Sequence, residues 1–139
     1  MPEAPIPNPD TAAMAEIEAV VRTYLDGLYE GDTDKLAQAF HPGSELRSEK
    51  DGVLVEVKRD AWLEAVKTRP NPKALGLTRH DRILAIDLAG PELAVVKLNC
   101  AIPPRFFTDV LVLLKLAPVE PAGSGWRIVS KAFRTETRE

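Results

Sequence analysis

The sequence predicts an α+β fold, in which N-terminal helices pack on the concave face of a strongly curved antiparallel sheet. Apolar residues recur at helical spacing in the first part of the chain, and long strand-like segments follow. These segments are longer than the usual strand of about five or six residues, which indicates curvature. A chain of 139 residues, 45% of them hydrophobic, favours a single domain over 1–139 with a pocket between helices and sheet.

The N-terminal part predicts a lead-in followed by a long helix. Residues 1–8 are rich in proline, so we expect an extended, flexible segment. Asn8 and Pro9 are typical of a helix start, and the helix of roughly 18 residues should end near Gly31. Its apolar stripe consists of Ile17, Val20, Val21, Tyr24, Leu25 and Leu28.

Two shorter helices are predicted next. Asp32 should cap a helix that carries Leu36 and Phe40 and that Pro42 stops. Asp60 should open another, which ends before two closely spaced prolines. Its buried side is expected to consist of Trp62, Leu63 and Val66.

The remaining segments predict strands. Residues 44–50 and 53–57 indicate a hairpin, because Asp51-Gly52 supplies the positive φ angles of a tight turn. The long strands are expected at residues 78–88, 92–102, 106–116 and 126–135.

Composition and missing motifs exclude several classes of function. The net charge of −3 and the lack of a dense basic run argue against nucleic-acid and anionic-membrane partners. No stretch approaches the roughly 18 apolar residues that a membrane span needs, and the N-terminus does not resemble a secretory signal. We therefore expect a cytoplasmic protein. The common phosphate-loop, dinucleotide and hydrolase motifs are missing, so we expect no cofactor.

Two segments carry a family resemblance. The run Tyr24-Leu-Asp-Gly-Leu-Tyr-Glu-Gly-Asp through Phe40-His-Pro resembles the opening of the NTF2-like superfamily. The pairing of Phe107-Thr-Asp-Val-Leu with Trp126-Arg-Ile-Val-Ser-Lys resembles its putative lumazine-binding or SnoaL-like branch. Over roughly residues 14–134, the resemblance implies a cone-shaped fold, a cavity at its wide end, and a homodimer formed through the sheet.

The resemblance extends to ketosteroid isomerases and implies roles for single residues. Tyr24 falls where those enzymes have an oxyanion-binding tyrosine, and Asp109 where they have an oxyanion-binding aspartic acid. Ser48 falls near the position of the proton-transferring aspartate, which a serine cannot replace. The side chains that could substitute, if a register shift brought one inside, are Glu45, Glu49 and His41.

Asp109 is the strongest candidate for a functional residue. Strand alternation places it on one face with Leu111. A carboxyl group in an apolar strand indicates either a pocket residue, acting with Tyr24 on one ligand oxygen, or an ion pair with Lys97 or Lys131. The simplest interpretation of the strand lysines is a set of solvated charges on the outer face of the sheet or at its edge, which would hold Lys97, Lys115 and Lys131. A cluster of these lysines around Asp109 would instead bind an anion.

The other candidates are pocket walls and rim residues. Phe40 and Trp62 are expected in the core and cavity wall, and His80 at the pocket rim. Arg105 follows two prolines near a sheet end and could guard an opening. Cys100 is expected to be a small buried hydrophobe. The two histidines show no metal-ligand spacing, so no metal site is predicted.

Three functions remain open at this point. The first is binding of a small apolar or aromatic molecule in the cavity, without covalent chemistry. The second is a cofactor-independent isomerase or lyase that abstracts a proton, with Asp109 as base or donor and Tyr24 as its oxyanion partner. The third is a dimeric structural or interaction domain with a filled core and exposed apolar residues at Val110, Val112 and Leu114.

Overall fold

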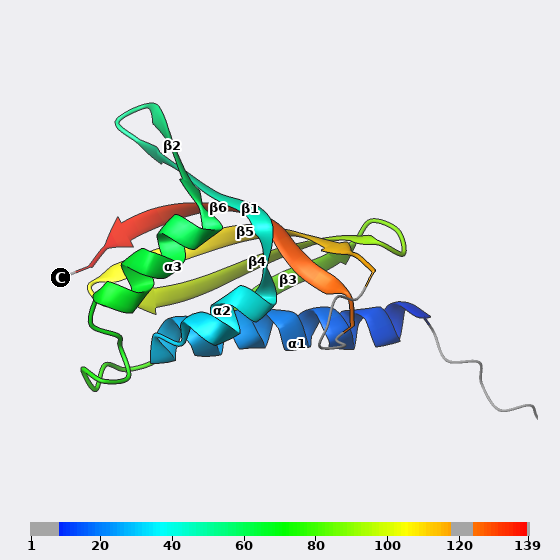
Figure 1. Ribbon diagram of the computed structural model, residues 1–139, viewed down its shortest axis with the longest axis horizontal. Coiled ribbons are helices and arrows are strands. Elements are labelled where there is room, and N and C mark those ends of the chain that lie inside the picture. Colours follow the sequence, from blue (N-terminus) through cyan, green and yellow to red (C-terminus); the bar gives the residue numbers. More distant parts are fainter. Residues whose placement is uncertain (1–8, 118–123, 139) are drawn as a thin grey trace, which may run out of the picture.

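The computed structural model describes residues 9–117 and 124–138, which form three helices and six strands (Figure 1). The lead-in expected at residues 1–8 lies outside them. The helices are α1 (Pro9–Glu30), α2 (Thr33–Ala39) and α3 (Arg59–Thr68). The strands are β1 (Phe40–Lys50), β2 (Val53–Lys58), β3 (Arg82–Leu88), β4 (Leu93–Ile102), β5 (Arg105–Lys115) and β6 (Trp126–Thr137).

The strands form one sheet in the order β2-β1-β6-β5-β4-β3, and α1 runs along its length (Figure 1). The predicted α+β class is confirmed, with one difference in strand direction. The neighbours β1 and β6 are parallel, whereas every other pair is antiparallel. A parallel pair needs a long crossover. The segment between β1 and β6 in the chain supplies it, since it contains α3 and the other four strands.

The turn from α1 to α2 forms as its residues predict. Gly31 has φ +68°, and the Asp32 N–H donates to the Gly27 carbonyl, which closes the end of α1. A Cβ on Gly31 would come within 2.7 Å of the Asn71 side chain, so the close approach also favours glycine. The Asp32 carboxylate then accepts from the N–H groups of Asp34 and Lys35, which caps α2.

The β1–β2 hairpin projects away from the rest of the sheet (Figure 1). Its turn has Asp51 at φ 51° and Gly52 at φ 79°, as expected for a two-residue Asp-Gly hairpin. At its tip, Val53 and Leu54 are exposed, while Leu46 on β1 is buried. The base of the hairpin therefore joins the core, and its tip does not.

Two predicted boundaries are wrong. Phe40 opens β1 instead of continuing the second helix, because its backbone is extended after its N–H closes the last bond of α2 to Leu36. The strand expected from residue 78 begins at Arg82, so His80 lies in the preceding connection. No helix within residues 9–117 or 124–138 is both long and apolar enough to span a membrane.

Candidate functional site

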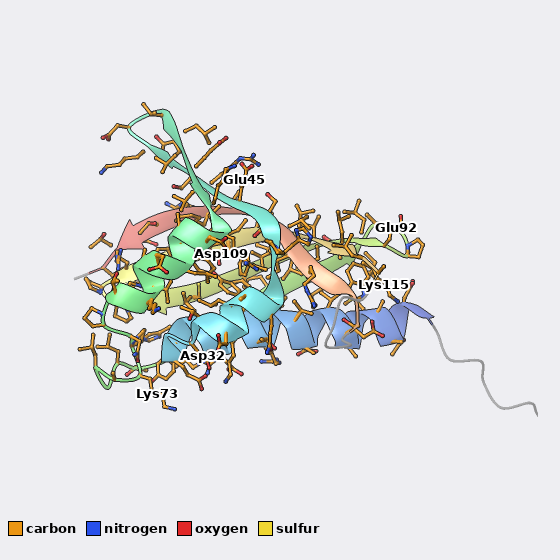
Figure 2. All side chains as sticks on the ribbon, in the orientation of Figure 1. Asp32, Glu45, Lys73, Glu92, Asp109 and Lys115 are labelled. Carbon is orange, nitrogen blue, oxygen red and sulfur yellow. The ribbon has the colours of Figure 1, made fainter. Side chains whose placement is uncertain are left out.

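Tyr24 of α1 and Asp109 of β5 meet inside the protein. The Tyr24 hydroxyl donates a 2.6 Å hydrogen bond to Asp109 Oδ2, and both residues are 0% exposed. Figure 2 places Asp109 in the interior, whereas Glu92 and Lys115 lie at the periphery. Both side chains are fully buried, so the hydroxyl is committed to Asp109 and neither group lines the pocket described below.

Two of the groups beside Asp109, the Tyr24 hydroxyl and the Cys100 thiol, are held in their neutral, proton-donating forms. Burial, and then the charge of Asp109, raise the pKa of Tyr24 well above its ordinary value. Burial is also the main cause that raises the pKa of Cys100, whose Sγ lies 3.7 Å from Asp109 Oδ2. Within the described chain, Asp109 Oδ1 is buried and has no hydrogen-bond partner. The polar contacts of the carboxylate therefore all go to its other oxygen, Oδ2.

Lys131 of β6 supplies the positive charge beside this carboxylate. Its Nζ lies 3.8 Å from Asp109 Oδ2 and close to three aromatic rings. The distances from Nζ to the ring centroids are 5.2 Å for Tyr24, 5.1 Å for Trp62 and 4.7 Å for Phe133. Of the two partners considered for Asp109, Lys131 is therefore the one present, and Lys97 is exposed.

The interpretation of Lys131 as an outer-face lysine is wrong, and a β-bulge explains why. Val112 pairs with Ser130, but Leu113 pairs with Ile128, so Val129 is an extra residue in β6. The extra residue shifts the alternation by one position. Trp126 and Ile128 face the core before the bulge, and Lys131 faces it afterwards.

A pocket of about 200 Å³ lies beside this cluster, between α3, the β1–β2 hairpin and the C-terminal half of β6. We call it the cone pocket. Trp62 of α3 and Lys131 reach it, so it begins where the buried cluster ends. Its walls are mostly apolar, and include Leu28, Leu46, Trp62, Ile102, Phe107 and Phe133.

The polar groups of the cone pocket are cationic or neutral. Arg69, Arg105 and Lys131 border it, together with the hydroxyls of Ser48 and Thr135. Among the described residues that line it there is no carboxylate and no imidazole. Arg105 stands at the pocket, in agreement with its expected place at an opening.

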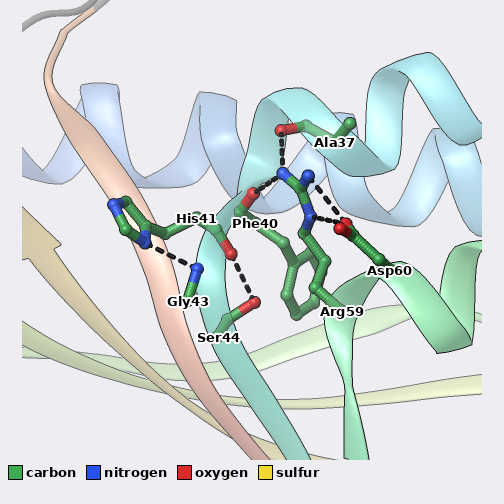
Figure 3. A network of polar contacts seen from close by, with 7 residues as sticks. All are labelled: Ala37, Phe40, His41, Gly43, Ser44, Arg59 and Asp60. Carbon is green, nitrogen blue, oxygen red and sulfur yellow. Dashed lines mark hydrogen bonds and ion pairs between the residues drawn. The ribbon is translucent and has the colours of Figure 1, made fainter.

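The three side chains that could have replaced the missing base point elsewhere. Glu45 pairs with Arg47, and the Glu49 carboxylate accepts from the Gly52 N–H at the hairpin turn. The imidazole of His41 makes a local contact and does not line the cone pocket. Its Nδ1 accepts from the Gly43 N–H at 2.9 Å (Figure 3).

The two predicted aromatic walls form one cluster with Tyr24. The Phe40 ring lies 5.1 Å from that of Tyr24 and 4.9 Å from that of Trp62. Trp62 borders the cone pocket, whereas Phe40 and Leu111 are 0% exposed and therefore belong to the core.

Arg59 at the start of α3 contacts the end of α2 and the first residue of β1 (Figure 3). Its Nη1 donates to the carbonyls of Phe40 at 3.0 Å and Ala37 at 3.4 Å, at the end of α2. A cation at a helix C-terminus is favourable. The contact joins the helix that carries Trp62 to the strand that begins with Phe40.

His80 does not line the cone pocket, although the hollow that it borders is also lined by Cys100 and by Phe107. It borders a wider hollow of about 470 Å³ whose strand residues include Asn99 and Thr108, on the face opposite to Asp109. Its ring stands 5.4 Å from that of Phe106. This hollow is larger, but the cone pocket is the better candidate because apolar walls enclose a few polar groups there.

Sequence reasoning missed Arg69, and it named Lys131 only as one of two possible partners of Asp109. Arg69 directly follows α3 and precedes Pro70, a position that suggested only the end of a helix. Lys131 would have been preferred over Lys97 if the bulge in β6 had been foreseen, because the bulge turns Lys131 inward. No cluster of three or more potential metal-ligating side chains occurs in residues 9–117 and 124–138.

Comparison with known proteins identifies a family whose model matches most of the sequence. Residues 12–134 match the family model described as "Putative lumazine-binding". No curated protein matches the sequence significantly.

Solved structures with a similar fold include two NTF2-like proteins of unknown function. One, from Silicibacter pomeroyi DSS-3, is 24% identical with a TM-score of 0.75, covering 91% of this chain and 98% of its own. The other, from Shewanella baltica OS155, is 22% identical with a TM-score of 0.76, and the match covers 92% of this chain and 97% of that protein. A ketosteroid isomerase-like protein from Erwinia carotovora atroseptica SCRI1043 is 14% identical with a TM-score of 0.64, covering 89% and 96%.

Proposed function

The chain belongs to the putative lumazine-binding family of the NTF2-like superfamily, and we propose that it binds a small, largely apolar or aromatic molecule in the cone pocket. One observation carries the proposal. Aromatic and aliphatic side chains enclose a pocket that has a nearly buried ammonium, that of Lys131, at its inner end. Ligand sites are mostly apolar, with a few fixed polar groups. A volume of about 200 Å³ is below the usual range, which favours a small ligand.

In this proposal, Tyr24 and Asp109 act on the ligand only through Lys131. Asp109 holds the ammonium by charge, and Tyr24 holds the carboxylate by its hydrogen bond. The three aromatic rings around Nζ restrict the lysine further. We therefore expect Asp109→Asn to change ligand affinity by releasing Lys131, without direct contact between residue 109 and the ligand.

Binding is favoured over an isomerase or lyase reaction because the pocket offers no ordinary base. Proton abstraction needs a basic group within hydrogen-bond reach of the substrate. The described lining of the cone pocket contains neither carboxylate nor imidazole, and Ser48 borders the pocket from β1. Asp109 is shielded from the pocket by complete burial.

The test is an NMR titration of isotope-labelled protein with the neutral probes indole, phenylacetamide and lumazine. We expect saturable shift changes at the amides of Trp62, Lys131 and Phe133. The variant Val55→Phe should reduce them, because Val55 lines the pocket from β2. Leu54→Phe is the matched control, since Leu54 is exposed and does not line the pocket. Shifts that do not saturate for any of the three probes, or equal effects of the two variants, would contradict the proposal.

A further inference from the structure

The charges that border the cone pocket have one sign. Arg105 is exposed, Arg69 is half-buried and Lys131 is nearly buried, so the positive charge extends from the mouth to the inner end. Among the described residues of the lining there is no acidic side chain. Asp109 lies behind Lys131 and offsets one of the three charges.

Arg69 and Arg105 have no partner within residues 9–117 and 124–138. Neither forms an ion pair there, and neither donates a hydrogen bond to a described residue. Elsewhere in the chain, arginines commonly pair with carboxylates, as do Arg22, Arg47, Arg59, Arg79 and Arg138. A guanidinium carries five N–H donors, and a group that is partly withdrawn from water is usually hydrogen-bonded. The half-buried Arg69 therefore has donors without a partner in the described chain, and the exposed Arg105 adds further donors at the same pocket.

The environment of Arg69 is unfavourable for its charge. Burial lowers the pKa of Arg69, and the charge of Arg105 lowers it further, so the two guanidinium groups repel each other. A bound anion would offset both effects, since it would attract both groups and supply acceptors. Arginine is well suited to this role because its planar fork matches a carboxylate.

We propose that the ligand of the cone pocket is a small organic anion, a carboxylate on an apolar or aromatic body. The carboxylate lies at Arg69 and Arg105, and the body packs against Trp62 and Phe133 toward Lys131. This inference rests on the proposed binding function and specifies the class of ligand.

The test compares matched acids and amides: benzoate with benzamide, phenylacetate with phenylacetamide, and hexanoate with hexanamide. Each pair differs in charge and hardly in shape. Affinities are measured by NMR titration of the full chain. We expect the best-binding acid to bind at least about tenfold more tightly than its amide, as charge-assisted hydrogen bonds provide. Added salt should weaken the binding of the acid more than the binding of its amide.

Variants then assign the preference to the two arginines. Arg69→Gln and Arg105→Gln should each reduce the ratio of acid affinity to amide affinity several-fold. Arg22→Gln is the matched control, because Arg22 is exposed on α1 away from the pocket. Melting curves establish that the variants remain folded.

The outcomes separate the two proposals. Equal affinities of acid and amide at the pocket amides, or a preference that survives both glutamine variants, would overturn the anion inference and leave the binding function standing. If no probe of either charge shifts the amides of Trp62 and Phe133, both proposals fail.

Discussion

The hydroxyl of Tyr24 and the carboxylate of Asp109 form a 2.6 Å hydrogen bond between residues 85 positions apart. The bond joins α1 to β5 in a place that water does not reach. It also places the negative charge where Lys131 can approach it. The pair thus holds a carboxylate beside the Lys131 ammonium, which borders the cone pocket. Stability measurements can test this role.

Removing the Tyr24 hydroxyl should destabilise the protein more than the loss of an ordinary hydrogen bond does. In Tyr24→Phe, Asp109 Oδ2 loses its short hydrogen bond, and Oδ1 already has no partner in the described chain. We expect the free energy of unfolding to fall by about 2–3 kcal/mol in urea denaturation. Tyr29→Phe is the control, since that hydroxyl donates to the Leu77 carbonyl in a partly buried place and should cost about 1 kcal/mol. Equal losses of stability in the two variants would show that the buried hydrogen bond contributes no more than the partly buried one.

Lys131 and Asp109 should be energetically coupled. Lys131→Met leaves a buried carboxylate without its counter-charge, and we expect a loss of about 3 kcal/mol or more. The double variant with Asp109→Asn should lose less than the sum of the single variants, with a coupling of about 1–3 kcal/mol. Lys97→Met, at an exposed lysine, should change stability by less than about 0.5 kcal/mol. Additive effects in the cycle would contradict the ion pair.

This ion pair shows where sequence reasoning succeeded and where it could not. Strand alternation correctly placed Asp109 on the inner face, because β5 is regular around it. The same rule failed for Lys131, because the extra residue Val129 in β6 reverses the alternation. A bulge depends on how two strands pair, and a single strand's pattern does not reveal it.

The turns and helices were predicted well because their causes are local. The Asp32 cap and the Asp51-Gly52 turn each follow from residues next to one another. The parallel pairing of β1 with β6 and the position of His80 outside the pocket depend on distant segments. The unpaired state of Arg69 and Arg105 also became visible only once the chain was folded.

Alkaline pH should destabilise the protein through Tyr24. Its folded pKa is raised above the ordinary value of 10.0, so the folded state holds this proton more tightly than the unfolded state. The stabilisation is therefore present below about pH 10 and is lost as pH rises toward the folded pKa. Above pH 10, loss of the Tyr24 proton in the unfolded state should lower the free energy of unfolding by about 1.4 kcal/mol per pH unit.

Cys100 should add to this alkaline loss, because its pKa is also raised, from an ordinary value of 9.0. Urea unfolding at a series of pH values measures the slope. The double variant Tyr24→Phe/Cys100→Ala should show a shallower slope than the unchanged chain. Identical slopes would mean that neither group keeps its proton because of folding.

Arg59 should stabilise the contact between α2 and α3. Arg59→Ala removes donors to two carbonyls at the end of α2 from a side chain that is 14% exposed. We expect a loss of about 1–2 kcal/mol in thermal or urea unfolding. Arg22→Ala removes only an exposed helical ion pair and should cost less than about 0.5 kcal/mol. A loss at Arg59 as small as that at Arg22 would contradict its role in joining the helices.

The most direct test of the account is a crystal structure of the protein soaked with phenylacetate. We expect the probe in the cone pocket, with its ring against Trp62 and Phe133 and its carboxylate at Arg69 and Arg105. Tyr24 and Asp109 should keep their hydrogen bond in that structure. A probe bound only in the outer hollow beside His80, with the cone pocket filled by side chains, would contradict the central claim.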